Sequence, residues 1–259
     1  MEARAKGRQE AAETRRGDGA IARGHAALLD VDPDLGAALS ETQRAQAKRE
    51  LVVEIVGLGR GAWREDLSAP ELFGLLVVDG ALVRRVVAGP GRSLEVLTRG
   101  DFVRPSREEE GETFGDAWFS SLGDSRVAVL GSEFAEAAAR WPALLDALLE
   151  RAIRRVCYLA HQAALDSRVG MERRVLLALW HLADRCGLVT PAGIELPLPL
   201  THQMISELVG AQRPSVSEAI WRLTSAGTLA RTEEQGWLLD RDSERALMAD
   251  AGPAGGGKG

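Results

Sequence analysis

Residues 200–239 read LTHQMISELVGAQRPSVSEAIWRLTSAGTLARTEEQGWLL, and this stretch decides the fold of the C-terminal part of the chain. Its pattern predicts two short helices with a sharp turn at Gly210 between them, followed by a two-stranded wing. Thr201 is expected to cap the first helix, and Pro214 stands in the first turn of the second, where its missing N–H is tolerated. The expected apolar faces are Ile205, Leu208 and Val209 in the first helix and Val216, Ala219, Ile220 and Leu223 in the second.

The second helix carries polar residues near its N-terminus, facing away from the apolar stripe. They are Arg213, Ser215, Ser217 and Glu218. A helix–turn–helix whose second helix is polar at this end is the arrangement that reads the major groove of DNA. A winged helix used only for protein contacts is the alternative. Arginine and hydroxyl side chains at the groove-facing positions favour DNA.

The run L-T-x-Q-x-I-x-x-L-V-G-A-x-R-P-S-V-S, followed by A-G-x-L and G-W-x-L, resembles the helix-turn-helix of the Crp–Fnr (cyclic-AMP-receptor-like) family of bacterial transcription regulators. The resemblance implies double-stranded DNA as a partner, with RNA polymerase as a further one. It also implies that Arg213 contacts a base or a phosphate. The expected DNA contacts are Thr201, His202, Gln203, Arg213, Pro214, Ser215, Ser217, Glu218, Arg222 and Arg231.

Two of these positions depart from the family pattern. Glu218 stands where the family often has an arginine, and Pro214 replaces a residue that often reads bases. A carboxylate can accept a hydrogen bond from cytosine N4, but it also repels phosphate. The family's usual operator sequence is therefore not transferred to this chain.

Composition describes an ordinary globular protein of 259 residues with a net charge of −6, long enough for two domains. It has no run of eighteen apolar residues and no apolar core in its N-terminal segment, so we expect no membrane span and no secretory signal. Cys157 and Cys186 are too few for a disulfide framework or a four-thiolate iron–sulfur cluster. The expected compartment is the cytoplasm, and no cofactor is expected.

The predicted fold class is α+β, with an N-terminal antiparallel β-roll like a cyclic-nucleotide-binding domain, a long dimerisation helix and a C-terminal winged helix. Regularly spaced apolar runs predict the strands, and Asp79-Gly80 predicts a hairpin between Leu75–Val78 and Ala81–Val87. Ser40 and Gln43 predict a capping box. The expected segments are a mobile leader (1–25), an effector-type roll (26–142), the dimerisation helix (143–166), the DNA-binding domain (167–247, its first helix at 171–186) and a disordered tail (248–259).

The long helix repeats apolar residues at alternating spacings of four and three, which is typical of a coiled-coil seam. The seam consists of Leu145, Leu149, Ala152, Val156, Leu159 and Ala163. Pairing of this seam with a second copy predicts a two-fold dimer, and in the resembled family this helix is the dimer axis. Packing of the seam on its own roll is the alternative.

An effector site is the least specified part of the chain. Arg104 and Trp118 are the candidate pocket residues. Four nearby glutamates argue against an anionic cyclic nucleotide: Glu108, Glu109, Glu110 and Glu112. His161 and Cys157 share a helix face and are interpreted as ordinary interface or surface residues, so no metal site is expected. No nucleophile elbow, zinc-ligand motif or phosphate loop is present, so the chain is not expected to be an enzyme.

These observations predict a homodimeric, sequence-specific transcription regulator that binds near-palindromic DNA. Control by an unidentified effector in the N-terminal roll, which the resemblance implies, and constitutive DNA binding are both left open. The alternative is a ligand-binding or protein-interaction module whose helix-turn-helix no longer binds DNA. The operator sequence, the target genes and the direction of regulation stay open.

Overall fold

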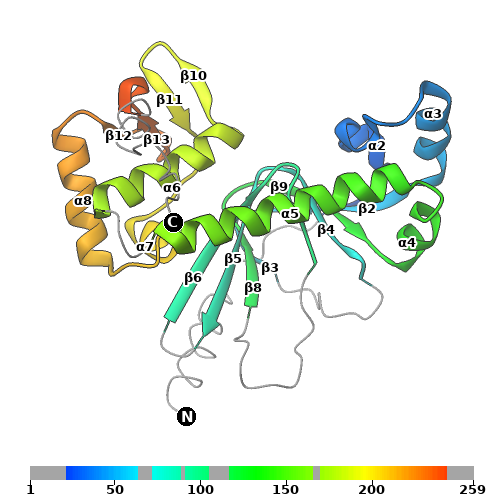
Figure 1. The fold of residues 1–259 in the computed structure, drawn as a ribbon, viewed down its shortest axis with the longest axis horizontal. Coiled ribbons are helices and arrows are strands. Elements are labelled where there is room, and N and C mark those ends of the chain that lie inside the picture. The colour runs from blue at the N-terminus through cyan, green and yellow to red at the C-terminus, as the bar shows by residue number, and fades with distance from the viewer. Residues whose placement is uncertain (1–21, 64–71, 89–90, 105–116, 166–169, 244–259) are drawn as a thin grey trace, which may run out of the picture. The chain divides into compact units, whose positions relative to one another are not determined.

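The computed structural model describes residues 22–63, 72–88, 91–104, 117–165 and 170–243 (Figure 1). The chain divides into two compact units, Met1–Ala160 and His161–Gly259. Most of the predicted leader, the predicted tail and the acidic segment near residue 110 lie outside the described residues. None of the helices in the described ranges is long and apolar enough to cross a membrane.

The first unit is an antiparallel roll with helices at both ends of its sequence. Its first elements are β1 (Ala22–Ala27), α2 (Leu28–Val31), the 3-10 helix η2 (Pro33–Gly36), α3 (Glu41–Glu50), β2 (Val52–Leu58) and β3 (Gly61–Trp63). Then come β4 (Gly74–Asp79), β5 (Ala81–Ala88), β6 (Gly91–Thr98), β7 (Phe102–Val103), β8 (Ala117–Ser121), β9 (Ser125–Leu130), α4 (Ser132–Ala138) and α5 (Pro142–Leu165). The strands form two sheets, in the orders β1-β2-β9-β4-β7 and β3-β8-β5-β6. The predicted antiparallel roll is confirmed.

Two hydrophobic clusters hold this unit together. One lies between the two sheets and includes Val56, Leu82 and Phe119. The other joins the larger sheet to the helices and includes Leu76 of β4 and Leu148 of α5. Because α5 takes part in this second cluster, part of the long helix belongs to the core of its own roll.

The predicted hairpin at Asp79-Gly80 is wrong, although the chain does turn there. β4 pairs with β7 and β9, whereas β5 pairs with β6 and β8, so the turn carries the chain from one sheet to the other. Gly80 has a φ of +74, and a Cβ at this position would lie 2.4 Å from the Ser125 hydroxyl. The glycine is therefore needed both for the left-handed conformation and for close packing of the two turns.

The prediction of a mobile leader over residues 1–25 is wrong for Ala22 to His25. These residues form most of β1, which pairs with β2 from Ala22↔Gly57 to Ala27↔Val52. The strand lies at the edge of the sheet and most of its side chains are exposed. β1 is held by backbone hydrogen bonds to β2 alone, and only a few of its side chains are partly buried. Its sequence therefore lacks the alternation of apolar and polar residues that predicts a strand.

The predicted helix start at Ser40 is confirmed. The Ser40 hydroxyl accepts a hydrogen bond from the backbone N–H of Gln43 (3.3 Å), and the Ser40 N–H donates to the Gln43 side chain (2.9 Å). The long helix is also confirmed, and it begins at Pro142, where proline is tolerated in the first turn.

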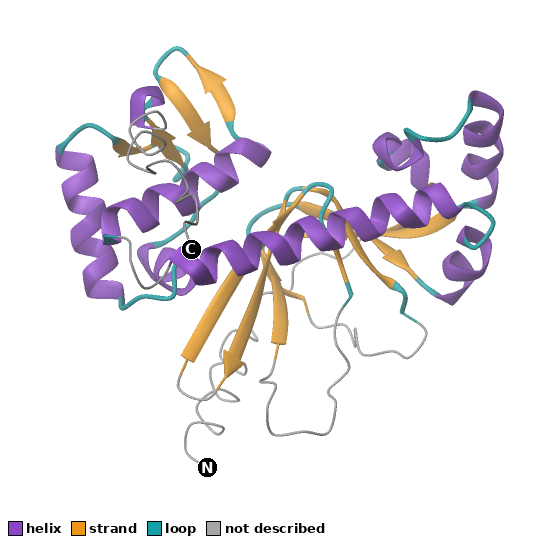
Figure 2. Ribbon diagram, in the orientation of Figure 1, coloured by secondary structure: helices purple, strands orange, loops and turns teal. Residues whose placement is uncertain are grey.

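The second unit is a winged helix, coloured yellow-green to red in Figure 1. It consists of α6 (Met171–Cys186), β10 (Leu188–Thr190), β11 (Gly193–Leu196), α7 (His202–Leu208), α8 (Arg213–Ser225), β12 (Leu229–Arg231) and β13 (Trp237–Leu239). The predicted two-stranded wing is only part of the observed sheet, which has four strands. Figure 2 shows the wing strands as part of a sheet, whose order is β10-β11-β13-β12.

Candidate nucleic-acid interface

The turn between α7 and α8 is built as predicted. The Thr201 hydroxyl caps α7 by accepting from the backbone N–H of Met204 at 3.2 Å, and Gly210 has a φ of +60. Arg174 of α6 donates a hydrogen bond to the Val209 carbonyl, which ties the end of α7 to the first helix of the unit. The helix end is therefore braced by a side chain as well as by its own backbone.

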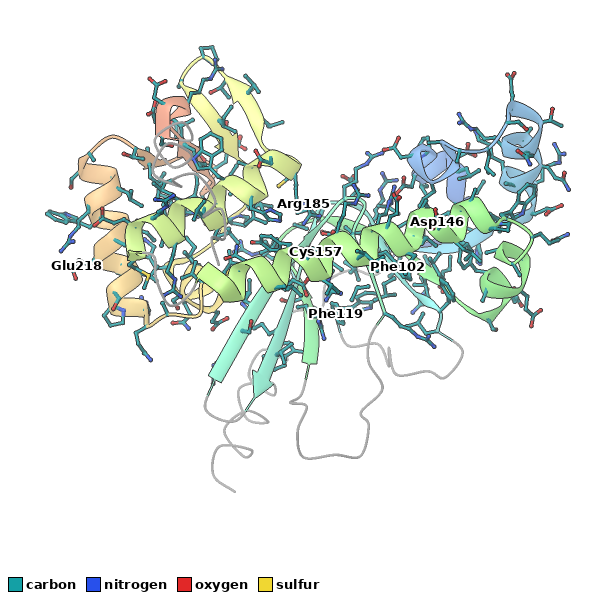
Figure 3. The ribbon with its side chains drawn as sticks, in the orientation of Figure 1. Phe102, Phe119, Asp146, Cys157, Arg185 and Glu218 are labelled. Carbon is teal, nitrogen blue, oxygen red and sulfur yellow. The ribbon has the colours of Figure 1, made fainter. Side chains whose placement is uncertain are left out.

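α8 has one buried and one outward face. Its apolar stripe is fully buried, as predicted: Val216, Ala219, Ile220 and Leu223. Arg213, Pro214 and Ser215 of the first turn are exposed. Arg213 is the first residue of the helix and Pro214 is the second, in its first turn as predicted. Figure 3 shows Glu218 on the side of α8 that faces away from the rest of its unit.

His202 is held in a cluster between α7, α8 and the wing. Its Nδ1 lies 3.1 Å from the Ser217 hydroxyl, and its ring stacks on Trp237 with centroids 6.1 Å apart. Burial lowers the pKa of His202, and the positive charges of Arg231 and Arg213 lower it further. The imidazole is therefore neutral near pH 7, and a neighbouring phosphate would favour its protonated form.

Arg231 braces the wing. Its guanidinium donates to the Leu200 carbonyl at 3.0 Å and lies 4.0 Å from the centre of the Trp237 ring. The Trp237 indole N–H donates to the same carbonyl at 3.1 Å. Burial lowers the pKa of Arg231. The predicted phosphate contact is thus a side chain with several partners inside its own unit.

Arg222 is also occupied. It lies 2.6 Å from a carboxylate oxygen of Glu218, four residues earlier on α8, and 3.2 Å from one of Glu172 on α6. The hydrogen bond to Glu172, followed by the charge of Glu218, raises the pKa of Arg222. The three residues line a groove between the start of α6 and α8. Two carboxylates offset the charge of Arg222 before any phosphate could approach it.

Gln203, the remaining candidate at the start of α7, donates to Glu207 at 2.9 Å. Among the predicted arginines, Arg213 differs from Arg222 and Arg231, because it has no hydrogen bond or ion pair within the described residues. Sequence reasoning missed Glu172, and it also missed Trp221, which is 68% exposed on the outward face of α8. The helical spacing of Trp221 from Pro214 was the available signal.

The predicted seam of α5 divides into two parts. Leu145 and Ala152 pack against the core of the roll. Leu149, Val156 and Leu159 are exposed by 55%, 59% and 37%. Ile153, absent from the predicted seam, is 51% exposed and completes an apolar band with them, and the side chain of Ala163 lies outside the described ones. The helix therefore has one apolar face for its roll and a neighbouring one in solvent.

Two arginines of α5 bind buried carboxylates of the roll. Arg151 forms a two-point salt bridge with Asp32, with Nη2 to Oδ1 at 2.9 Å. Arg155 does the same with Glu95 of β6, with Nη2 to Oε2 at 2.8 Å, and Arg84 of β5 approaches that oxygen at 3.5 Å. The partners are far apart in sequence, so no local pattern could have revealed these pairs.

The predicted effector residues are not brought together by any described polar contact. Arg104 is exposed and ends a described range, and Trp118 is half-buried on β8 opposite Arg85. No hydrogen bond, ion pair or ring contact joins Arg104 to Trp118 in the parts of the chain that the structure describes. Cys157 is exposed and Cys186 is half-buried, and the described residues contain no group of three or more potential metal ligands.

Comparisons with known proteins agree with this architecture. Residues 173–243 match the family model of the Crp-like helix-turn-helix domain. A CooA mutant from Carboxydothermus hydrogenoformans is 17% identical, with a TM-score of 0.58, over 74% of this chain and 84% of its own. FixK2 from Bradyrhizobium japonicum is 20% identical, with a TM-score of 0.56, over 73% and 93%.

A CRP/FNR-family transcriptional regulator from Thermus thermophilus is 16% identical, with a TM-score of 0.55, over 75% of this chain and 98% of its own. At these identities the likeness establishes the fold: an antiparallel roll, a long helix and a C-terminal winged helix, as predicted. A search of curated protein sequences gives no match.

Proposed function

We propose that this chain, which carries a Crp-like helix-turn-helix domain in the fold of Crp–Fnr regulators, is a sequence-specific DNA-binding transcription regulator that acts as a homodimer. The observation that carries the proposal is the first turn of α8, where Arg213, Pro214 and Ser215 are exposed above a fully buried apolar stripe. Recognition helices place their N-terminal residues against base edges in the major groove.

Arg213 is the side chain best suited to read a base. It stands at the first position of α8 and is free of ion pairs within the described residues, whereas Arg222 and Arg231 are bound by other groups. An arginine can donate two hydrogen bonds to guanine O6 and N7, a contact that is worth about 1–3 kcal/mol of discrimination. Ser215, also exposed in this turn, is suited to a phosphate or a base edge.

The dimer rests on the exposed band of α5. Leu149, Ile153 and Val156 are each more than half exposed, and they follow one another at helical spacing. Pairing of two such bands about a two-fold axis would remove them from water. It would also present two recognition helices to successive major grooves about 34 Å apart, at a near-palindromic site.

Effector control belongs to the same proposal. α5 is tied to the roll by the Arg151–Asp32 and Arg155–Glu95 pairs, so a ligand that shifts β6 or the α2–η2 junction, where Glu95 and Asp32 lie, would also shift the dimer helix. The transcriptional output would pass to RNA polymerase. Arg104 and Trp118 stay candidate effector contacts, at a place where the neighbouring residues 105–116 lie outside the described ones.

The test is a selection of duplexes from a random pool by the full-length chain, followed by affinity measurements over a range of salt concentrations. Arg213→Ala should weaken binding at every salt concentration and relax the preference at one base pair in each half-site. Arg126→Ala, which removes an exposed arginine of the roll, is the matched control and should bind as the wild type does. Selection that enriches no sequence, or an Arg213→Ala protein with the wild-type affinity and base preference, would refute the proposal.

A further inference from the structure

Trp221 lies on the outward face of α8 and is 68% exposed. At 100° per residue it stands nearly above Pro214 and beside Glu218, so it shares the face that these residues present. Its indole N–H has no hydrogen-bond partner among the described residues. A large apolar ring with one free donor is thus displayed on the helix that is proposed to enter DNA.

The polar side chains around Trp221 are already bonded within the protein. The Thr224 hydroxyl donates to the Ile220 carbonyl at 2.8 Å, and the Ser225 hydroxyl donates to the Trp221 carbonyl at 2.9 Å. Arg222 is held by two carboxylates. Within the described residues, the C-terminal half of α8 therefore presents the Trp221 indole to a binding partner, and it presents no unpaired cation.

The position of Trp221 along α8 indicates which part of a duplex it would meet. It follows Arg213 by eight residues, which is about 12 Å along a helix axis. The major groove is about 8.5 Å deep. When the Arg213 end reaches the base edges, Trp221 therefore stands at the level of the groove wall, where the sugar–phosphate backbone runs.

We infer that Trp221 is a DNA-backbone contact, with its ring against a deoxyribose and its indole N–H donating to a phosphate oxygen. This inference rests on the proposed function and adds a binding residue to it. The contact reads no base, so its removal should weaken binding to every sequence by the same factor. Because a neutral indole displaces no counterion, its removal should leave the salt dependence unchanged. The uniform loss separates Trp221 from a base-reading Arg213, and the unchanged salt dependence separates it from a charged residue that contacts a phosphate.

The experiment uses the full-length chain, a duplex enriched by the wild type from a random pool and a scrambled duplex of the same composition. Trp221→Ala should bind both duplexes about tenfold more weakly, which corresponds to the loss of roughly 60 Å² of apolar contact. Trp221→Phe keeps a ring and loses the N–H, so its loss should be smaller. Val189→Ala, which truncates a 76% exposed residue of β10, is the matched control and should bind as the wild type does.

Each outcome bears on the inference. An equal loss on both duplexes with an unchanged salt slope supports it. Wild-type affinity of Trp221→Ala, or an altered sequence preference, overturns it while the proposed function stands. If the wild type itself enriches no duplex, the proposed function fails, and this inference fails with it. Thermal unfolding of each variant confirms that it is folded.

Discussion

Arg151→Ala should destabilise the roll strongly, because it leaves a buried charge without its partner. The side chain of Asp32 is 6% exposed and that of Arg151 is 11% exposed, and the guanidinium meets both carboxylate oxygens. Breaking a buried pair of this kind costs about 3–5 kcal/mol. For a unit of this size, such a loss lowers the unfolding temperature by roughly 6–20 °C.

The Arg126–Asp79 pair in the same unit supplies the matched control. Its nitrogen and oxygen are 3.4 Å apart, and its side chains are 55% and 60% exposed. Exposed pairs contribute about 0–1 kcal/mol, so Arg126→Ala should be nearly neutral. Replacing both buried partners, as Arg151→Met with Asp32→Leu, should recover most of the stability, because no unpaired charge remains.

Hydrogen exchange measured by mass spectrometry is the suitable assay, because it reports on the two units of the chain separately. Peptides from β4, β9 and the first half of α5 should exchange faster in Arg151→Ala than in Arg126→Ala, and peptides of the winged helix should be unaffected. If the two single variants lose stability to within about 1 kcal/mol of each other, the argument from burial is wrong.

Two further results are expected. In an NMR titration the pKa of His202 should lie below the usual value of 6.5, and Arg231→Ala should raise it, because one of the charges that lower this pKa is removed. As the pH falls, the His202 imidazole is protonated in the unfolded chain before it is protonated in the folded one. The contribution of His202 to stability is therefore complete above pH 6.5 and is lost as the pH falls towards the pKa of the folded state. A measured pKa above 6.5 would contradict this expectation. Val156→Glu should shift the protein from dimer to monomer in sedimentation velocity, because it places a charge in the exposed apolar band of α5. Arg154→Glu, on the other side of α5, should leave the dimer intact. Equally strong dimers in both variants would exclude the apolar band as the dimer interface.

The elements that could be predicted from the sequence are those defined by local signals. The cap at Thr201, the glycine at position 210 and the apolar stripe of α8 all lie within a few residues of the structures they define. Hydrogen bonds and turn conformations of this kind depend on neighbouring residues, so the sequence reveals them directly. The boundaries of α6 match the predicted range of residues 171–186, although this helix has no side-chain cap.

The features that could not be predicted depend on distant partners. Asp79-Gly80 marks a turn, but its sequence does not say that the next strand joins the other sheet. β1 is a strand because β2 offers it a free edge. Likewise, Arg222 and Arg231 look like available cations in the sequence, whereas the fold sets Glu172 and the Leu200 carbonyl beside them. Such partners are set by tertiary packing, which overrides local propensity.

The stack of Arg231, Trp237 and His202 against Ser217 has a consequence for the kind of duplex that the winged helix would select. This stack joins the wing to the recognition helix already in the DNA-free protein, so these side chains lose little conformational entropy when DNA binds. A preformed surface cannot follow the local shape of DNA, and the duplex would have to adjust to it. Sites rich in easily bent pyrimidine–purine steps would then be favoured, even at base pairs that no side chain touches.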